Sequence, residues 1–162
     1  AQGASLVATD TNEAALEEAR RMGATVVGAE EIYDVECDIF SPCALGGTLN
    51  SRTIPRLKCK IVAGGANNQL EMDEDGLALQ RRGVLYAPDY IVNAGGVITV
   101  ASEIEGGYSL DRAQEMAERI YETTERVLHI ASSDGIPTVL AADRLAEERI
   151  NAVRSVRGIY RG

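Results

Sequence analysis

Ile61-Val62-Ala63-Gly64-Gly65-Ala66-Asn67-Asn68-Gln69-Leu70 is the stretch that decides the fold: an apolar run that ends in two glycines and two adjacent amides. A short run rich in β-branched residues is typical of a buried parallel strand, and this one opens into a turn with exposed backbone. In open α/β sheets, ligands bind in the crevice beyond the carboxyl ends of the strands. Because a carboxamide both donates and accepts hydrogen bonds, Asn67 and Asn68 suit a neutral polar group such as another carboxamide.

Taken alone, this stretch has a simpler explanation, an asparagine that caps a helix after a glycine turn. A second element of the same kind follows at Tyr90-Ile91-Val92-Asn93-Ala94-Gly95-Gly96-Val97. Two such elements in one chain favour a binding site.

Strands and helices alternate around these two stretches and then give way to helices alone. We expect strands at 5–10, 25–27, 37–41, from 61 and at 84–87, and helices at 12–23, 53–57, 72–82, 93–105, 110–133 and 138–156. This order predicts an α/β fold, a Rossmann-like doubly wound parallel sheet with a C-terminal helical extension. We expect one domain over residues 1–162, with the sheet and its connections to about residue 105 and the helical tail from about residue 108.

Composition excludes several classes of function. The 162 residues carry a formal net charge of −9, and no apolar run is long enough to span a bilayer, so we expect neither nucleic-acid nor membrane partners. The three cysteines are irregularly spaced and form no CxxC motif, which indicates reduced thiols in a cytoplasmic protein.

No catalytic or metal-binding constellation is visible. The single histidine, His129, lies within the predicted helix 110–133 near its core face, and no triad partner accompanies it. Cys43 has no base beside it. Glu71 to Gly76 resembles the start of a calcium loop, but Arg82 occupies the twelfth position, where a bidentate glutamate is required. We expect no metal site and no catalytic residue in this chain.

Asp10 closes the first predicted strand. In a dinucleotide-binding fold, an acid at the tip of the second strand binds the ribose hydroxyls of NAD, and here it would repel the 2′-phosphate of NADP. The alternative is a cap for the helix that starts near Asn12. The glycine-rich fingerprint should lie about 20 residues before this acid, but only nine residues precede it, and Ala1-Gln2-Gly3 has the pattern of a helix end. We therefore expect a fragment that lacks the first βα unit.

The missing strand has a consequence for the sheet. In the strand order 3-2-1-4-5-6, the first strand lies at the centre. Its absence would leave two half-sheets with unpaired backbone edges. We expect these edges to pair directly with each other or with another copy of the chain.

Five longer motifs resemble the amino-acid dehydrogenases. Asp34 to Gly47 is similar to the corresponding segment of the leucine, valine and phenylalanine dehydrogenases. The others are Ala66-Asn67-Asn68-Gln69-Leu70, Tyr86-Ala87-Pro88-Asp89-Tyr90, Val92-Asn93-Ala94-Gly95-Gly96-Val97-Ile98, and Ile136-Pro137-Thr138 followed by Ala141 to Arg149. The resemblance covers essentially the whole chain, is strongest to the leucine dehydrogenases, and extends to the superfamily that contains glutamate dehydrogenase.

The resemblance implies NAD-dependent oxidative deamination of a branched-chain or aliphatic L-amino acid to its 2-oxo acid and ammonia, in a homo-oligomer. The residues that it assigns to the cofactor are Asp10, Pro42, Cys43, Ala44, Ala66, Asn67 and Asn68. It assigns Asn93, Val97 and Val100 to the substrate, and the two valines would give no partner to a side-chain carboxylate. The alternative for the valines is ordinary helix core.

The same resemblance places the catalytic lysine and aspartate in an N-terminal domain outside this chain. The chain alone is therefore expected to be inactive and to bind NAD weakly. The alternative function is a non-catalytic remnant that serves in assembly or regulation.

Overall fold

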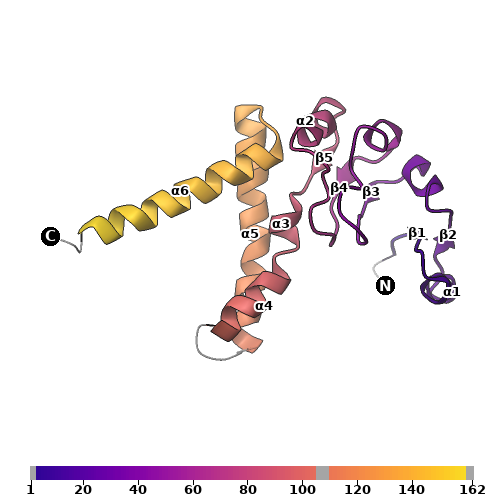
Figure 1. Cartoon of the computed structure of the whole chain (residues 1–162), viewed down its shortest axis with the longest axis horizontal. Coiled ribbons are helices and arrows are strands. Elements are labelled where there is room, and N and C mark those ends of the chain that lie inside the picture. The colour runs from indigo at the N-terminus through magenta and orange to yellow at the C-terminus, as the bar shows by residue number, and fades with distance from the viewer. Residues whose placement is uncertain (1–2, 105–109, 160–162) are drawn as a thin grey trace.

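Parallel strands form two small sheets in the computed structural model, which describes residues 3–104 and 110–159 (Figure 1). One sheet pairs β1 (Val7–Ala8) with β2 (Thr25–Val26), and the other has the order β3 (Ile39–Phe40), β4 (Ile61–Val62), β5 (Leu85–Tyr86). In the second sheet, Ile61 pairs with Ile39 on one side and with Leu85 on the other. The predicted stretch at Ile61 is therefore the central strand of the larger sheet.

Helices connect the strands and then continue alone. Their bounds are α1 Glu13–Arg21, η1 Glu31–Asp34, η2 Ile54–Arg56, α2 Glu74–Arg81, α3 Asp89–Val92, α4 Gly95–Ile104, α5 Leu110–Asp134 and α6 Thr138–Ile159. The α/β fold with its parallel strands and helical extension is confirmed. The division of the domain near residues 105–108 stays a prediction. The predicted helix end at residues 1–3 lies partly outside the described residues, and Glu105, the last residue of the predicted helix 93–105, lies outside them.

The expected pairing of the two half-sheets within one chain is wrong. β1 and β3 belong to separate sheets, and no ladder joins them in the part of the chain that the structure describes. Pairing of these edges with another copy stays a prediction. Each of the five strands is also shorter than expected, with two residues.

Two short helices differ from the expectation. The sequence predicts that Tyr90 to Val92 resemble the strand end at Ile61, but these residues lie in α3. The reason is Pro88, whose fixed φ of −55° places it as the N-cap residue of a helical turn. The other helix, η1, has only four residues, too few to show a period in the sequence.

The core consists of two clusters. The first surrounds β4 and contains Leu49, Ile54, Leu57, Cys59, Val62, Leu79, Val84 and Tyr86. The second joins α3 to the long helices α5 and α6 through Ile91, Val127, Ala131, Ala141 and Ala142. The helix α3, which directly precedes Asn93, is thereby packed against the helical extension through Ile91.

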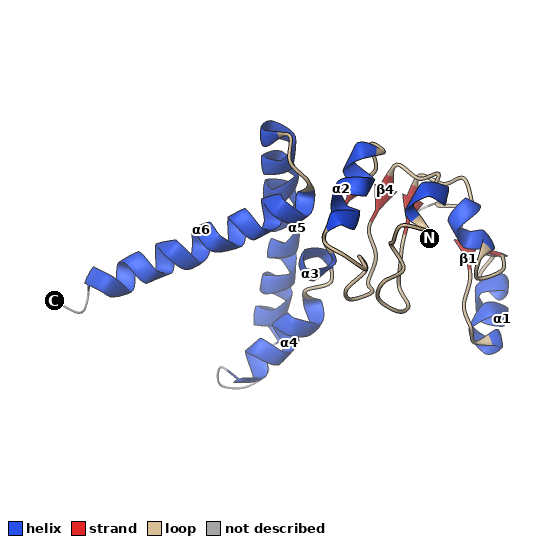
Figure 2. Ribbon diagram, turned by 45° about the horizontal axis from the view of Figure 1, so that its top comes forward, coloured by secondary structure: helices blue, strands red, loops and turns tan. Residues whose placement is uncertain are grey.

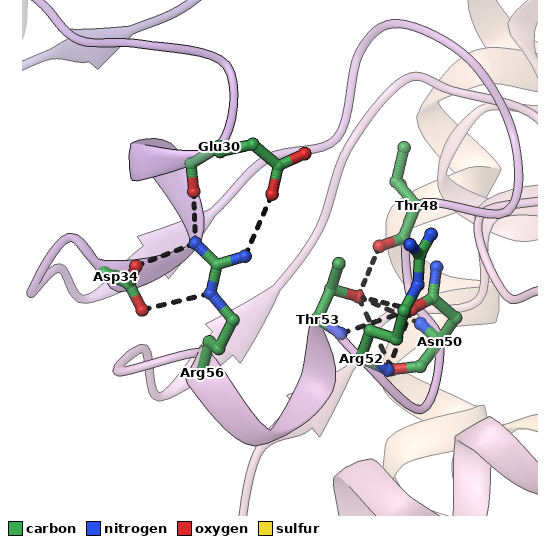
Figure 3. A network of polar contacts seen from close by, with 7 residues as sticks. All are labelled: Glu30, Asp34, Thr48, Asn50, Arg52, Thr53 and Arg56. Carbon is green, nitrogen blue, oxygen red and sulfur yellow. Dashed lines mark hydrogen bonds and ion pairs between the residues drawn. The ribbon is translucent and has the colours of Figure 1, made fainter.

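Arg56 ties the smaller sheet's side of the chain to the larger sheet (Figure 3). Its guanidinium donates to Asp34 over 2.7 and 3.2 Å and to the Glu30 carboxylate over 3.0 Å, and it also donates to the Glu30 carbonyl. The same group lies 5.4 Å from the centre of the Tyr33 ring. The elements β1, α1 and β2 contribute no buried residue to either cluster. The Arg56 contacts give a polar link between η2 and the segment at Glu30 and Asp34.

The outer half of α6 projects away from the rest of the molecule (Figure 2). Ile150 and Val153 lie there with about half of their surface exposed. None of the helices in the described ranges is long and apolar enough to cross a membrane.

Candidate functional site

The side chains of Asn67 and Asn93 meet at the carboxyl ends of β4 and β5. The Asn93 Nδ2 group donates to Asn67 Oδ1 over 2.8 Å. Asn67 is exposed and Asn93 is half-buried, so the unused amide N–H groups of both side chains and the Asn93 oxygen remain open to a ligand. The structure therefore brings together the two elements that the sequence singled out.

A buried carboxylate supports this pair. Asp89 is 8% exposed and accepts from the Asn68 backbone N–H over 2.7 Å and from the Tyr86 hydroxyl over 2.8 Å. Asn68 has φ 52°, the left-handed region that only a minority of residues other than glycine adopt. Burial, followed by the hydrogen bond to Asp89, raises the pKa of the Tyr86 phenol well above its usual range, so Tyr86 stays a donor.

Gln69 fixes the loop between Gly64 and Asn68 from its buried side. It is fully buried, and its Nε2 group donates to the Gly64 carbonyl over 2.8 Å and to the Ala66 carbonyl over 3.0 Å. Within the described part of the chain, the Gln69 Oε1 atom and the Thr48 hydroxyl have no hydrogen-bond partner. The loop between Gly64 and Asn68 is therefore fixed by side chains that do not themselves face the ligand.

The loops after β3 and β4 pack directly on each other. The Ala66 N–H donates to the Pro42 carbonyl over 2.9 Å, and a Cβ at Gly64 would lie 2.1 Å from the same oxygen. Pro42 and Ala66 are buried, so among the proposed cofactor residues these two shape the loops and do not offer a surface. Cys43 and Ala44 are exposed, and the Cys43 sulfur lies 3.4 Å from Ser41 Oγ.

Asp10 follows β1 at the edge of the smaller sheet. Its Oδ1 atom accepts from the Asn12 N–H over 2.8 Å, while Asn12 is the residue that caps α1. Asp10 is exposed and makes no hydrogen bond to the loops at Pro42 or Ala66 within the described ranges. The N-cap residue of α1 is therefore Asn12 and not Asp10, so the helix-cap alternative is wrong for Asp10. The Asp10 carboxylate instead stabilises the turn before Asn12.

Val97 and Val100 lie on α4, next to Asn93 in the chain. They are 73% and 56% exposed, so the alternative that they form ordinary helix core is wrong for this chain. A Cβ at Gly95 or Gly96 would meet no atom within 4 Å, which leaves open space over the start of α4.

A cavity of about 440 Å³ adjoins the site between α2, α3 and the start of α6. Its polar lining includes Asn68, Asp73, Asp89, Tyr90 and Asp143. The Tyr90 hydroxyl lies 3.3 Å from Asp143 Oδ1, and burial together with that carboxylate raises the pKa of the phenol.

Other candidate chemistry stays outside this site. His129 is exposed on α5, which corrects its expected place near the core face. The described residues hold no cluster of three ligand side chains suited to a metal ion. Sequence reasoning missed the roles of Gln69, Tyr86 and Asp89, although a carboxylate directly after Pro88 in an otherwise apolar segment was a usable signal.

The arrangement fits a neutral ligand that carries a carboxamide. The glycines at 65, 95 and 96 leave backbone uncovered on both sides of the amide pair. Asn67 and Asn93 supply both donors and acceptors but no charge. A nicotinamide group has this chemistry.

Comparison with known proteins gives a consistent result. Residues 2–158 match the sequence profile of the Glutamate/Leucine/Phenylalanine/Valine dehydrogenase family. The leucine dehydrogenase of Bacillus cereus is 52% identical over 161 residues, 99% of this chain and 44% of the relative. The crystal structure of L-tryptophan dehydrogenase from Nostoc punctiforme superposes with a TM-score of 0.88 at 47% identity, covering 91% of this chain and 45% of that one.

A more distant structure shares the fold. Hetero-hexameric glutamate dehydrogenase from Thermus thermophilus, in its leucine-bound form, superposes with a TM-score of 0.67 at 20% identity and covers 96% of this chain. The chain thus spans somewhat less than half the length of the relatives that it matches.

Proposed function

Because the chain belongs to the glutamate, leucine, phenylalanine and valine dehydrogenase family, we propose that it forms the cofactor-binding part of an NAD-dependent amino-acid dehydrogenase. The reaction is the oxidative deamination of a branched-chain or aliphatic L-amino acid to its 2-oxo acid and ammonia. The observation that carries the proposal is the hydrogen-bonded pair of Asn67 and Asn93 at the carboxyl ends of adjacent parallel strands.

Asn67 and Asn68 hold the nicotinamide side of the cofactor. Their carboxamides can pair with the nicotinamide carboxamide and with the ribose beside it, since both partners are neutral and polar. Cys43 and Ala44 offer an exposed surface along the cofactor's path. Pro42 and Ala66 position that surface, because they pack the loops after β3 and β4 against each other. When bound, NAD supplies the acceptor for the substrate hydride.

Asp10 selects NAD over NADP. Its exposed carboxylate, at the end of β1, can accept from the ribose hydroxyls and would repel a 2′-phosphate. Support comes from its geometry, because Asn12 already caps α1 and leaves Asp10 Oδ2 without a partner in that turn.

Val97 and Val100 face the substrate side chain, and Asn93 binds its polar end. An apolar, uncharged surface favours an aliphatic side chain and leaves a side-chain carboxylate unpaired, which disfavours glutamate. The exposure of both valines supports this role, since side chains that the described residues leave uncovered are free to contact a ligand.

The whole enzyme is a homo-oligomer, and its proton-transfer residues, a lysine and an aspartate, lie outside this chain. Its residues bind and orient the cofactor, so the chain alone is inactive and binds NAD weakly. A glutamate dehydrogenase with the same fold is a hetero-hexamer, so the fold is compatible with assembly of several chains.

Isothermal titration of the chain with NAD and with NADP tests the proposal. We expect weak binding of NAD, no measurable binding of NADP, and loss of this preference in Asp10→Ala. Asp111→Ala is the matched control, because Asp111 is another exposed acid, at the start of α5. No heat with NAD at millimolar concentration would favour the alternative, a non-catalytic remnant in assembly or regulation.

A further inference from the structure

Asp89 is a buried carboxylate whose contacts run to two different elements of the site. Its side chain does not cap its own helix, since no side-chain hydrogen bond is made at the start of α3. It accepts instead from the Asn68 N–H over 2.7 Å and from the Tyr86 hydroxyl over 2.8 Å. No lysine or arginine in the described ranges forms an ion pair with it. Among the described residues, two hydrogen bonds therefore hold the Asp89 carboxyl group, one from the site loop at Asn68 and one from Tyr86 in the core beneath it.

The backbone of the same residue holds the other half of the amide pair. The Asn93 N–H donates to the Asp89 carbonyl over 2.8 Å. The carboxylate thus fixes the peptide that follows Asn67, and the carbonyl fixes the peptide of Asn93. The side-chain bond between Asn67 and Asn93 closes this ring of contacts at 2.8 Å.

The left-handed turn at Asn68 explains why such an anchor is needed. At φ 52° a residue with a Cβ is less stable than in the ordinary regions, so an unsupported loop would relax toward negative φ. That change would rotate the peptide between Asn67 and Asn68. The Asn67 carboxamide would then leave Asn93, although neither side chain had been altered.

We propose that Asp89 is a positioning residue that holds the Asn67–Asn93 amide pair in place, so that Asn67 is presented to the nicotinamide end of the cofactor and Asn93 to the polar end of the substrate. Tyr86 orients the Asp89 carboxylate. The inference rests on the proposed dehydrogenase function for the identity of the ligand. The geometry that Asp89 maintains does not depend on that ligand and can be measured without it.

The experiment uses the chain labelled with ¹⁵N and compares Asp89→Ala with Asp89→Asn. Alanine removes both acceptors, whereas asparagine keeps one oxygen for the Asn68 N–H. In Asp89→Ala we expect the side-chain amide signals of Asn67 and Asn93 to shift and hydrogen exchange at the Asn68 amide to rise by about tenfold or more. Asp89→Asn should restore most of the wild-type signals. Rescue by the conservative variant separates positioning from simple loss of stability.

Two further variants keep the test decisive. Asp73→Asn is the matched control, because this exposed acid lines the same cavity without bonding Asn68, and it should leave the three signals unchanged. If Asp89→Ala does not fold, Tyr86→Phe replaces it, and a smaller change in the same direction is expected. Unchanged Asn67, Asn68 and Asn93 signals in a folded Asp89→Ala or Tyr86→Phe chain would overturn the proposal.

Addition of NAD separates the two hypotheses. If wild-type Asn67 and Asn93 do not respond to NAD while Asp89→Ala still disturbs them, the proposed function fails and the positioning role stands. If NAD shifts the wild-type signals and Asp89→Ala leaves them at their wild-type positions before and after addition, the positioning role fails and the function stands.

Discussion

Asn93 Nδ2 donates to Asn67 Oδ1 over 2.8 Å, across 26 residues of sequence, and so joins the loop after β4 to the turn after α3. Neither side chain is fully buried, so water could satisfy both, and the contact is not explained by the need to pair buried polar groups. The loops around it are fixed by Gln69 and Asp89. A site built from amides on a rigid support is suited to a neutral polar ligand.

Loss of the Asn93 side chain should weaken cofactor binding without unfolding the chain, because its Nδ2 group holds the Asn67 carboxamide that we assign to the nicotinamide side. A neutral hydrogen bond contributes about 0.5 to 1.5 kcal/mol net, so Asn93→Ala is expected to raise the Kd for NAD by about 2- to 12-fold. Calorimetric titration measures this change. Asn151→Ala, at an exposed position on α6, is the control and should leave the Kd unchanged. Equal effects of the two substitutions would count against a role for Asn93.

The adjacent glycines Gly64 and Gly65 should respond very differently to alanine. A Cβ at Gly64 would lie 2.1 Å from the Pro42 carbonyl oxygen, whereas a Cβ at Gly65 would have only the Cys43 sulfur near it, at 4.0 Å. We expect Gly64→Ala to lower the free energy of unfolding by about 1 to 3 kcal/mol or more, because Pro42 must move. Gly65→Ala should be neutral or stabilising by up to about 1 kcal/mol.

Urea unfolding monitored by circular dichroism gives both values. A Gly64→Ala chain as stable as Gly65→Ala would show that the loops at 42–44 and 64–68 do not pack as described.

Stability should fall at alkaline pH chiefly because of Tyr86, which is far more buried than Tyr90, the other described tyrosine whose pKa is raised. The pKa of Tyr86 is raised in the folded chain, first by burial and then by Asp89, whereas in the unfolded chain it has its ordinary value of 10.0. A raised pKa stabilises the fold fully below pH 10, and that contribution is lost as the pH rises further toward the folded pKa. The free energy of unfolding, measured by urea at pH values from 8 to about 11, should therefore decline above about pH 10.

Tyr86→Phe should flatten this decline, because phenylalanine does not ionise. Tyr121→Phe is the matched control, since Tyr121 is 75% exposed and should leave the wild-type slope intact. If both variants gave the same slope, Tyr86 would not be the group responsible.

The open edges of β1 and β3 should promote association of two copies. The Leu6 and Ala8 carbonyls accept from β2 and the residue after it, so the Val7 backbone faces the free edge of β1, since alternate residues of a strand bond to opposite neighbours. We expect wild-type dimers in sedimentation velocity. Val7→Pro removes the edge donor and should give monomers, whereas Ala4→Pro, at an exposed position outside the strand, should not. A wild-type chain that stays monomeric at every concentration would refute this prediction.

The sequence predicted the strand at Ile61 and the long helices because their signals are local. β4 shows its β-branched run, and α5 keeps its 3.6-residue period over 25 residues. Asn67 and Asn93 were identified because both precede or follow paired glycines at an element end. The contact between them could not be predicted, since it depends on the turn that Pro88 starts.

The residues that support the site could not be identified from the sequence, because their contacts are not local. Gln69 and Asp89 act through backbone groups of residues five and 21 positions away, and a sequence pattern contains no record of such pairings. The expected direct pairing of the half-sheets failed in the same way. Strand shortness in β1 and β3 leaves few groups to form a ladder, which the length of the apolar runs did not indicate.

Titration of the ¹⁵N-labelled chain with NAD, followed at the asparagine side-chain amides, tests the central claim most directly. We predict progressive, saturable shifts at Asn67 and Asn93 as NAD reaches millimolar concentration, with Asn151 on α6 unaffected. Unchanged signals at Asn67 and Asn93 throughout the titration would contradict the assignment of Asn67 to the nicotinamide end of a dehydrogenase site, with Asn93 bonded beside it.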